Sequence, residues 1–138
     1  MKPYHESPVV THTVRVVAPF ILTFGLFTLL HGTKSVGGGF QGGVIVASVA
    51  VLFAFAFGVS QTEATLPGVR IVAFAALGLL SFAAVAGAAL VVGRPFLDTT
   101  AFGVSPVYPV EVIEVAIGVT VASVVTGLFF ELARADDA

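Results

Sequence analysis

The sequence predicts an all-α, polytopic membrane protein with four transmembrane helices. Hydrophobic residues make up 57 % of the 138 residues and charged residues only 10 %, whereas soluble domains carry about 25 % charged residues. The mean hydropathy of the chain is +1.07. Four apolar stretches approach the roughly 20 residues that a helix needs to cross the hydrocarbon of a bilayer. The short alternating segments that are typical of membrane strands are not visible in the sequence.

The four expected spans form a single membrane domain, residues 1–138. They are placed at about 14–30, 41–59, 69–92 and 110–132. The third span is the clearest of the four. The second span reaches an adequate length only when it is extended back through Phe40 and Gln41. Little of the chain is therefore expected outside the membrane.

Turn-forming residues separate the later spans. The connector at 60–68 contains Pro67 and Gly68, a pair that forms turns and stops a preceding helix. The connector at 93–109 contains three prolines and two glycines. As the longest connector, it is expected to have some local structure of its own.

The charges predict an orientation and exclude one class of partner. Cytoplasmic ends of spans carry an excess of Lys and Arg. One side of the predicted membrane domain has four such residues and the other has two, which are Lys2, Arg15, Arg70 and Arg134 against Lys34 and Arg94. This bias favours both termini in the cytoplasm. The net charge of −2 gives no basic face for nucleic acid.

Two acidic residues open the fourth span. Glu111 and Glu114 are three residues apart and lie on one helical face. Acidic side chains near a helix N-terminus are favoured by the helix dipole, and this favours an interfacial position for Glu111. Glu114 lies one turn deeper, which favours a buried or cavity-facing carboxylate. Such a group can hold a proton or Na⁺, or pair with a cation of a neighbouring subunit.

Three further polar residues lie between the first two spans and are candidates for an ion path. Histidine is the side chain whose charge changes near physiological pH, so His31 suits either a proton relay or an interfacial position. Lys34 suits a membrane-surface anchor, a partner for a carboxylate such as Glu114 or Asp98, or part of a relay. Gln41 can donate and accept hydrogen bonds beside unwound backbone. We predict no catalytic residue, metal site or cofactor, because no suitable His, Asp, Glu or Ser pattern occurs and the chain has no cysteine.

Glycines concentrate at the start of the second span and recur in the fourth. A glycine triplet permits sharp backbone bends, and glycines four residues apart let two helices approach closely. The fourth span repeats this small-residue spacing within 116–127. The residues predicted to pack helices together are Gly37, Gly38, Gly39, Gly42, Gly43, Gly118 and Gly127.

The stretch HG....GGGFQGGVIVAS at 31–48 resembles the most characteristic motif of the MnhB/MrpB family. The stretch VEVIEVAIGVTVASVV at 110–125 is similar to the last helix of that family, where an acidic residue precedes a small-residue run. The resemblance puts Glu114 on the acidic position of the family. The chain departs from the family pattern at Val36, where proline is usual, and in the order of small residues around Gly118.

This resemblance implies a small, non-catalytic subunit of the multisubunit Mrp-type Na⁺/H⁺ antiporter in the plasma membrane of a prokaryote. The implied partners are large subunits similar to those of complex I, other small membrane subunits, and the lipid bilayer. Na⁺ and H⁺ are the implied transported ions. The subunit would pack tightly at an interface and help to shape the cation path.

Two other interpretations remain open from the sequence. Related subunits occur in membrane-bound hydrogenases, so the chain also suits a redox-driven ion pump that resembles complex I. A self-contained small channel, held together by its glycine faces, is a further interpretation.

Overall fold

The computed structural model describes residues 7–34 and 37–136. This part of the chain contains helices and no strand. The elements in chain order are α1 (Pro8–Leu30), α2 (Gly39–Phe57), α3 (Val59–Thr65), α4 (Gly68–Val91), η2 (Thr99–Phe102) and α5 (Val107–Asp136). The predicted all-α class is confirmed, and four of the helices, α1, α2, α4 and α5, are long and apolar enough to cross a membrane.

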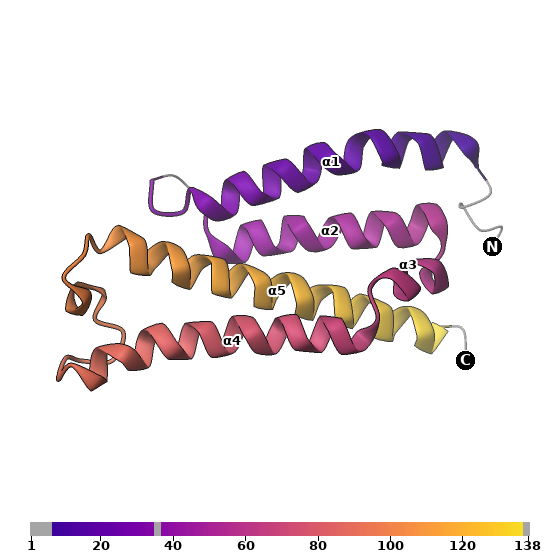
Figure 1. Ribbon diagram of the computed structural model, residues 1–138. Coiled ribbons are helices and arrows are strands. Elements are labelled where there is room, and N and C mark those ends of the chain that lie inside the picture. The colour runs from indigo at the N-terminus through magenta and orange to yellow at the C-terminus, as the bar shows by residue number, and fades with distance from the viewer. Residues whose placement is uncertain (1–6, 35–36, 137–138) are drawn as a thin grey trace.

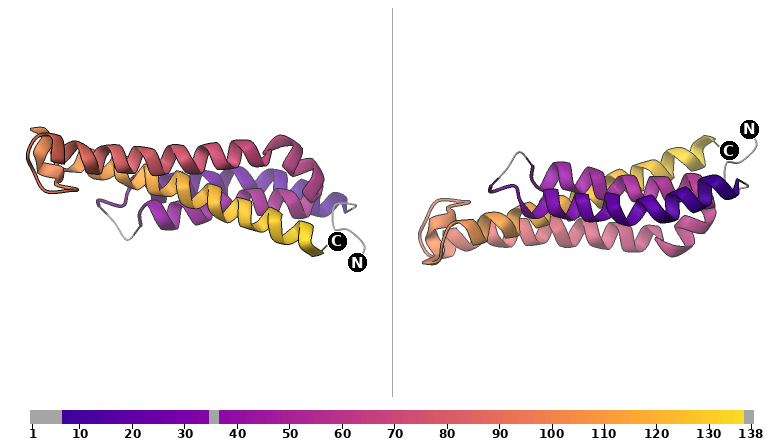
Figure 2. Two further views of the ribbon diagram at one scale, coloured as in Figure 1. Left: turned by 90° about the horizontal axis from the view of Figure 1, so that it is seen from below. Right: turned by 90° about the horizontal axis from the view of Figure 1, so that it is seen from above.

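The long helices lie in the spatial order α1, α2, α5, α4, which differs from their order in the chain (Figure 1). The main contacts join α1 to α2, α2 to α5, and α5 to α4. The axes of all four long helices are roughly aligned, as the two turned views also show (Figure 2). Helices α2 and α5 are therefore the central pair, and each has a neighbour on two sides.

The helix ends sort into two groups. The start of α1, the end of α5 and the short helix α3 lie at one end of the molecule (Figure 1). The connection between α1 and α2 lies at the opposite end, together with the loop that contains η2. The glycine-rich segment and the long 93–109 connector are thus on the same side, which agrees with the common side expected for Lys34 and Arg94.

Helix α1 begins earlier than the predicted span. Pro8 occupies the first turn of the helix, where its fixed φ and missing N–H are tolerated. Polar residues of this first part are accommodated on the surface. The guanidinium of Arg15 lies 5.3 Å from the ring centroid of Phe57 on α2, a distance suited to a cation–π contact.

A break at Gly58 separates α2 from a helix that the sequence analysis treated as a connector. Gly58 has a φ of 93°, a value that L side chains rarely adopt. Helix α3 then starts at once, and the Thr62 hydroxyl donates a hydrogen bond to the carbonyl of Gly58 at 2.9 Å. The chain reaches Pro67 directly after this helix, and α4 follows. The Pro67-Gly68 turn was therefore placed correctly, but a short helix precedes it.

The long connector between α4 and α5 has the local structure that was expected. Its short helix η2 starts at the side chain of Asp98, which accepts hydrogen bonds from the Thr100 hydroxyl at 2.6 Å and the Thr100 backbone N–H at 2.9 Å. Arg94 lies 3.8 Å from the other carboxylate oxygen. The hydroxyl of Thr100, its backbone N–H and the charge of Arg94 together hold the pKa of Asp98 below its usual value.

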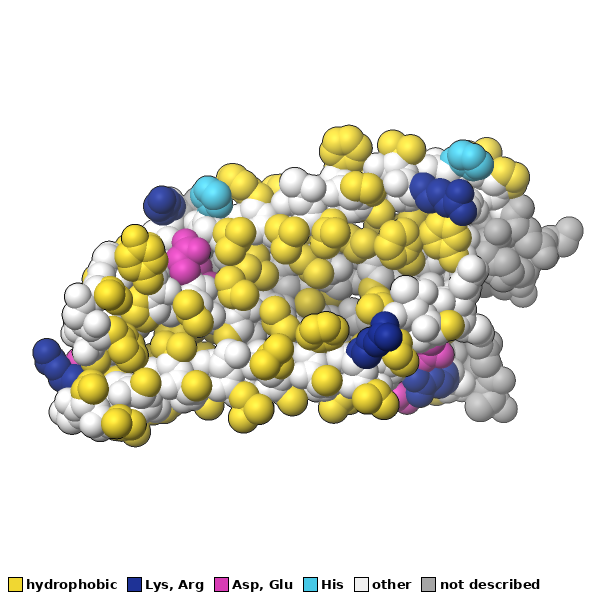
Figure 3. All heavy atoms as spheres, in the orientation of Figure 1, with side chains coloured by type: hydrophobic (Ala, Val, Ile, Leu, Met, Phe, Trp, Pro, Cys, Tyr) yellow, Lys and Arg dark blue, Asp and Glu magenta, His cyan; other side chains and the backbone are white. Residues whose placement is uncertain are grey.

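The surface of the four-helix arrangement is largely apolar. Only 17 to 33 % of the most hydrophobic window of each candidate span is buried within the chain. Hydrophobic side chains cover the middle of the face seen in Figure 3, and charged and histidine side chains lie toward the two ends. A soluble protein would not expose so much apolar surface, so this surface suits lipid or other membrane subunits.

Candidate functional site

The backbones of α2 and α5 touch where both helices have glycine. A Cβ atom added to Gly43 would lie 2.6 Å from the carbonyl oxygen of Gly118 and 3.0 Å from Cβ of Val121. A Cβ on Gly39 would overlap the backbone carbonyl of Glu114 and lie 2.9 Å from Cβ of Ile117. Two of the predicted packing glycines of α2 therefore lie directly against α5.

The face of α2 that carries Gly42 packs equally closely against α1. A Cβ on Gly42 would lie 2.5 Å from Cβ of Leu29 and 2.8 Å from the Leu29 backbone nitrogen. Gly118 of α5 faces the same leucine, because a Cβ there would overlap Cδ1 of Leu29. Three helices thus meet at one level of the molecule, where larger residues would not fit.

The remaining predicted glycines lie at the margins of this contact. Gly37 precedes α2 and faces Thr28 of α1, with a would-be Cβ 3.1 Å from the threonine carbonyl oxygen. Gly38 is the residue before α2 and has a φ of 150°. Gly127 lies far along α5, and its would-be Cβ is 3.3 Å from Cγ2 of Ile71. The contact at Gly127 is looser than those at the start of α2.

The carboxylate of Glu114 points into the glycine segment. A Cβ on Gly32 would overlap both carboxylate oxygens, and a Cβ on Gly38 would lie 3.4 Å from Oε1. The same point at Gly38 is 3.7 Å from Oε1 of Gln41. Oε2 of Glu114 is buried and has no hydrogen-bond partner among the described residues. Both glutamates are half-buried, and Glu114 differs in having a buried carboxylate oxygen without a partner among the described residues.

Glu111 has a different environment one turn earlier. Its side chain is half-buried, and its Oε1 accepts a hydrogen bond from the Thr33 hydroxyl at 3.3 Å. Glu111 also lines an open hollow of about 340 Å³ between α4 and α5, together with Ser81 and apolar side chains. The two carboxylates therefore share a helical face but not a partner.

The other predicted polar residues lie near the same end of the molecule. His31 follows α1, stacks on the ring of Phe27 at a centroid distance of 4.0 Å, and has Nδ1 3.2 Å from the Phe27 carbonyl oxygen. Gln41 is exposed in the first turn of α2. Lys34 is exposed, and within residues 7–34 and 37–136 its ammonium forms no ion pair with Glu114 or Asp98.

Two glycines that make close contacts at or near the site, Gly32 and Gly78, were not predicted from the sequence. Gly32 contacts the Glu114 carboxylate, and it follows His31 in the quoted motif, so the signal was present. Gly78 of α4 lies against α5, where a Cβ would lie 2.6 Å from the Ala116 carbonyl oxygen. The continuous apolar run around Gly78 gave no sign of which face α4 presents to α5.

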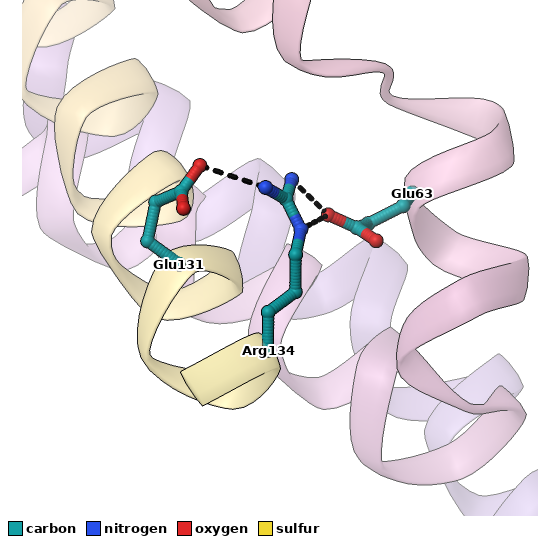
Figure 4. Close-up of polar contacts among 3 residues, drawn as sticks. All are labelled: Glu63, Glu131 and Arg134. Atoms are coloured by element: carbon teal, nitrogen blue, oxygen red, sulfur yellow. Dashed lines mark hydrogen bonds and ion pairs between the residues drawn. The ribbon is translucent and has the colours of Figure 1, made fainter. Parts of the chain in front are cut away.

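An ion-pair cluster at the opposite end also escaped the sequence reasoning. Arg134 of α5 donates from Nε to Glu63 of α3 at 2.9 Å, and from Nη1 to Glu131 at 2.9 Å (Figure 4). The arginine side chain is half-exposed. Because the two glutamates are far apart in the sequence, only the fold shows that they share one arginine.

The described residues 7–34 and 37–136 contain no group of three His, Asp or Glu side chains suited to hold a metal ion. The Glu114 carboxylate lies beside the contact of the three helices, next to Gly32 and Gly38.

Comparison with known proteins gives a family. The model for the domain related to the MnhB subunit of Na⁺/H⁺ antiporter matches residues 9–131. This range includes all of α2, α3 and α4, α1 except Pro8, and α5 as far as residue 131. The match therefore covers most of the four-helix arrangement, including Glu111, Glu114 and the glycine segment.

Several curated staphylococcal proteins, each named "Putative antiporter subunit mnhB2", are similar to this chain. The protein from Staphylococcus epidermidis is 35 % identical over 96 residues, which is 69 % of this chain and 67 % of the relative. The protein from Staphylococcus saprophyticus is 38 % identical over 96 residues, with the same two coverages. By its family model and these relatives, the chain belongs to the MnhB family.

Proposed function

We propose that this chain is a non-catalytic membrane subunit of a multisubunit Na⁺/H⁺ antiporter, where it packs beside other subunits and helps to shape the cation path. The chain's membership of the MnhB family supports the role as an antiporter subunit. The names of the relatives specify antiporter subunits, so they favour this function over a redox-driven ion pump.

The observation that carries the subunit role is the distribution of polar groups along the four helices. Helix α2 has no ionisable residue, and those of the other described helices lie toward their ends. An exchanger needs a polar path across the hydrocarbon, since isolated charges there are costly. A chain with an apolar middle needs other subunits to complete such a path.

The uncovered helix faces support assembly with other membrane subunits. Large apolar side chains are exposed on all four long helices, for example Phe20 on α1, Phe55 on α2, Leu80 on α4 and Leu128 on α5. Such side chains face lipid or protein with similar ease. The large subunits and small subunits of the antiporter are the proposed neighbours on these faces.

The proposed site residues divide into two sets. Glu114, Gln41, His31 and Lys34 lie near one end of the molecule and are the proposed contributors to the ion path. The seven predicted glycines are the proposed packing residues, and the close contacts of Gly39, Gly42 and Gly43 support this role most directly.

We place the protein in the plasma membrane of a prokaryote with both termini in the cytoplasm. Support comes from the basic residues at the end where α1 begins and α5 ends. Arg15, Arg70 and Arg134 belong to helix ends of that side, and Lys34 and Arg94 belong to the other. The positive-inside tendency then favours the side with three arginines as cytoplasmic.

The test uses the complete set of antiporter subunits expressed together, with and without this chain. Na⁺-dependent proton transport in everted vesicles is measured beside a native gel of the complex. We expect loss of transport without the chain and recovery when it is supplied. Full transport without the chain would refute the proposed function.

A glycine variant separates packing from path lining. Gly42→Leu forces a side chain against the backbone of Leu29, and we expect the complex to be lost from the native gel. Gly87→Leu is the matched control, because a Cβ at Gly87 has no atom within 4 Å. An assembled Gly42→Leu complex that lacks transport would instead favour path lining.

A further inference from the structure

The Glu114 carboxylate lies in an environment that is unusual for a charged group. Gly32 lies against both of its oxygens, so closely that a single methyl group there would overlap them. Gly38 lies at ordinary contact distance, since a Cβ there would be 3.4 Å from Oε1. Glycine at position 32 leaves the carboxylate room between the α1–α2 connection and α5.

Among the described residues, no basic side chain forms an ion pair with the Glu114 carboxylate. Oε2 of Glu114 is buried and accepts no hydrogen bond among the described residues. The ionisable side chains on the surrounding segments are Glu111 on α5, and His31 and Lys34 in the connection, whereas α2 has none. Glu111 bears the same charge as Glu114, and Lys34 forms no ion pair within the described chain. A carboxylate with a buried oxygen and no such partner takes up a cation or is neutralised by a proton.

The geometry favours a proton over Na⁺. Oε2 is closed to a water-sized sphere, and Gly32, which lies so close that a Cβ there would overlap both oxygens, has no side chain that could serve as a ligand. Na⁺ needs a shell of several oxygen ligands, as hard cations in proteins do, and a closed oxygen leaves no room for water to supply one. A proton needs only one carboxylate oxygen.

We infer that Glu114, whose carboxylate lies against Gly32 and Gly38, is a proton-binding site of the antiporter complex. This inference rests on the proposed function and names the ion that its central acidic residue takes. The carboxyl group gains the proton on one oxygen and becomes neutral, and it returns to a carboxylate when the proton leaves. Glu111, whose oxygen accepts a hydrogen bond from Thr33, is outside this site.

Infrared difference spectroscopy of the purified complex tests the site directly. A protonated carboxyl group has a C=O stretching band that shifts in heavy water. We expect one such band at neutral pH to disappear in Glu114→Gln and to persist in Glu131→Gln, a control at the exposed far end of α5. Identical bands in all three complexes would overturn the inference. A carboxylate band of Glu114 that shifts on addition of Na⁺ would also overturn it.

A second variant tests the enclosure if Glu114→Gln does not assemble. Gly32→Ala places a methyl group on the carboxylate, so we expect the same infrared band to shift or vanish, whereas Gly68→Ala, which has open space, leaves it unchanged. An unshifted band in Gly32→Ala would overturn the inference. The proposed function fails separately, only if complexes that lack the whole chain still transport.

Discussion

Replacing Gly42 by alanine tests whether close helix contact stabilises the protein. The new methyl carbon would lie 2.5 Å from Cβ of Leu29 and 2.8 Å from its Cα. Carbon atoms pack best at about 3.5–4.0 Å. Helices α1 and α2 must therefore separate by about 1 Å along this contact, because the obstacle includes backbone and cannot rotate away.

The net effect combines two opposing terms. Overpacking of a close contact costs about 1–3 kcal/mol. Alanine also favours the helix over glycine by about 0.5–1 kcal/mol. We therefore expect Gly42→Ala to lower the free energy of unfolding by about 1 kcal/mol or more, and Gly87→Ala, with no atom within 4 Å, to leave it equal or higher.

The thermal midpoint of each variant in detergent, followed by circular dichroism and by retention of the complex, measures this difference. A Gly42→Ala midpoint that equals or exceeds that of Gly87→Ala would refute the reasoning. It would mean that α1 and α2 do not rely on the contact at Leu29.

Three further predictions concern other parts of the chain. A double-mutant cycle on Arg134 and Glu63 should give a coupling of about 0.2–1 kcal/mol that shrinks in high salt, because the arginine is half-exposed; a coupling independent of salt would contradict this. Thr100→Val should raise the pKa of Asp98 toward its usual value, because the hydroxyl is the largest cause of the lowered pKa. The native pKa lies below the unfolded one, so the stabilising contribution is present above the unfolded pKa and is lost as the pH falls through the native pKa; a carbon NMR titration of the aspartate checks both statements. Gly127→Ala should be tolerated, because the nearest obstacle is the end of an isoleucine side chain 3.3 Å away, and a midpoint that falls as far as that of Gly42→Ala would contradict this.

Hydropathy and turn residues predicted the four long helices because both signals are local. Each helix has a long apolar run, and the Pro67-Gly68 pair lies where a connection is needed. The same signals missed α3, because a polar helix of seven residues has no apolar run to reveal it. Its start depends on the backbone of Gly58, which has a φ of 93° and which composition does not show.

The spatial order of the helices could not be predicted from hydropathy. An apolar helix in a membrane looks much the same on every face, so the sequence does not state which neighbour it touches. Gly78 illustrates this, since it lies in a uniform apolar run and yet faces the carbonyl of Ala116 on α5. The glycines at the start of α2 did predict a contact, but not that Gly42 faces α1 while Gly43 faces α5.

The candidate site also has some features that the local sequence predicted and others that only the fold shows. The pair Glu111 and Glu114 was recognised from its spacing, and Glu114 has a buried oxygen without a partner among the described residues. The role of Gly32 depends on how the α1–α2 connection folds over α5, which no local pattern encodes. Lys34, offered as a partner for Glu114, forms no ion pair with it in the described chain, because its side chain is exposed.

The glycine segment links the packing of the helices to the proposed proton site. In lipid, apolar burial gives little drive for two helices to associate, so association depends on close contact and on hydrogen bonds. The residue that lets α2 approach α5, Gly39, lies against the backbone carbonyl of Glu114. The carboxylate of the same residue lies against Gly32, so Glu114 belongs both to the helix contact and to the proposed proton site. A larger residue at Gly39 would prevent the close approach of the helices, and a larger residue at Gly32 would take the room of the carboxylate. The two roles therefore constrain the same short stretch of sequence.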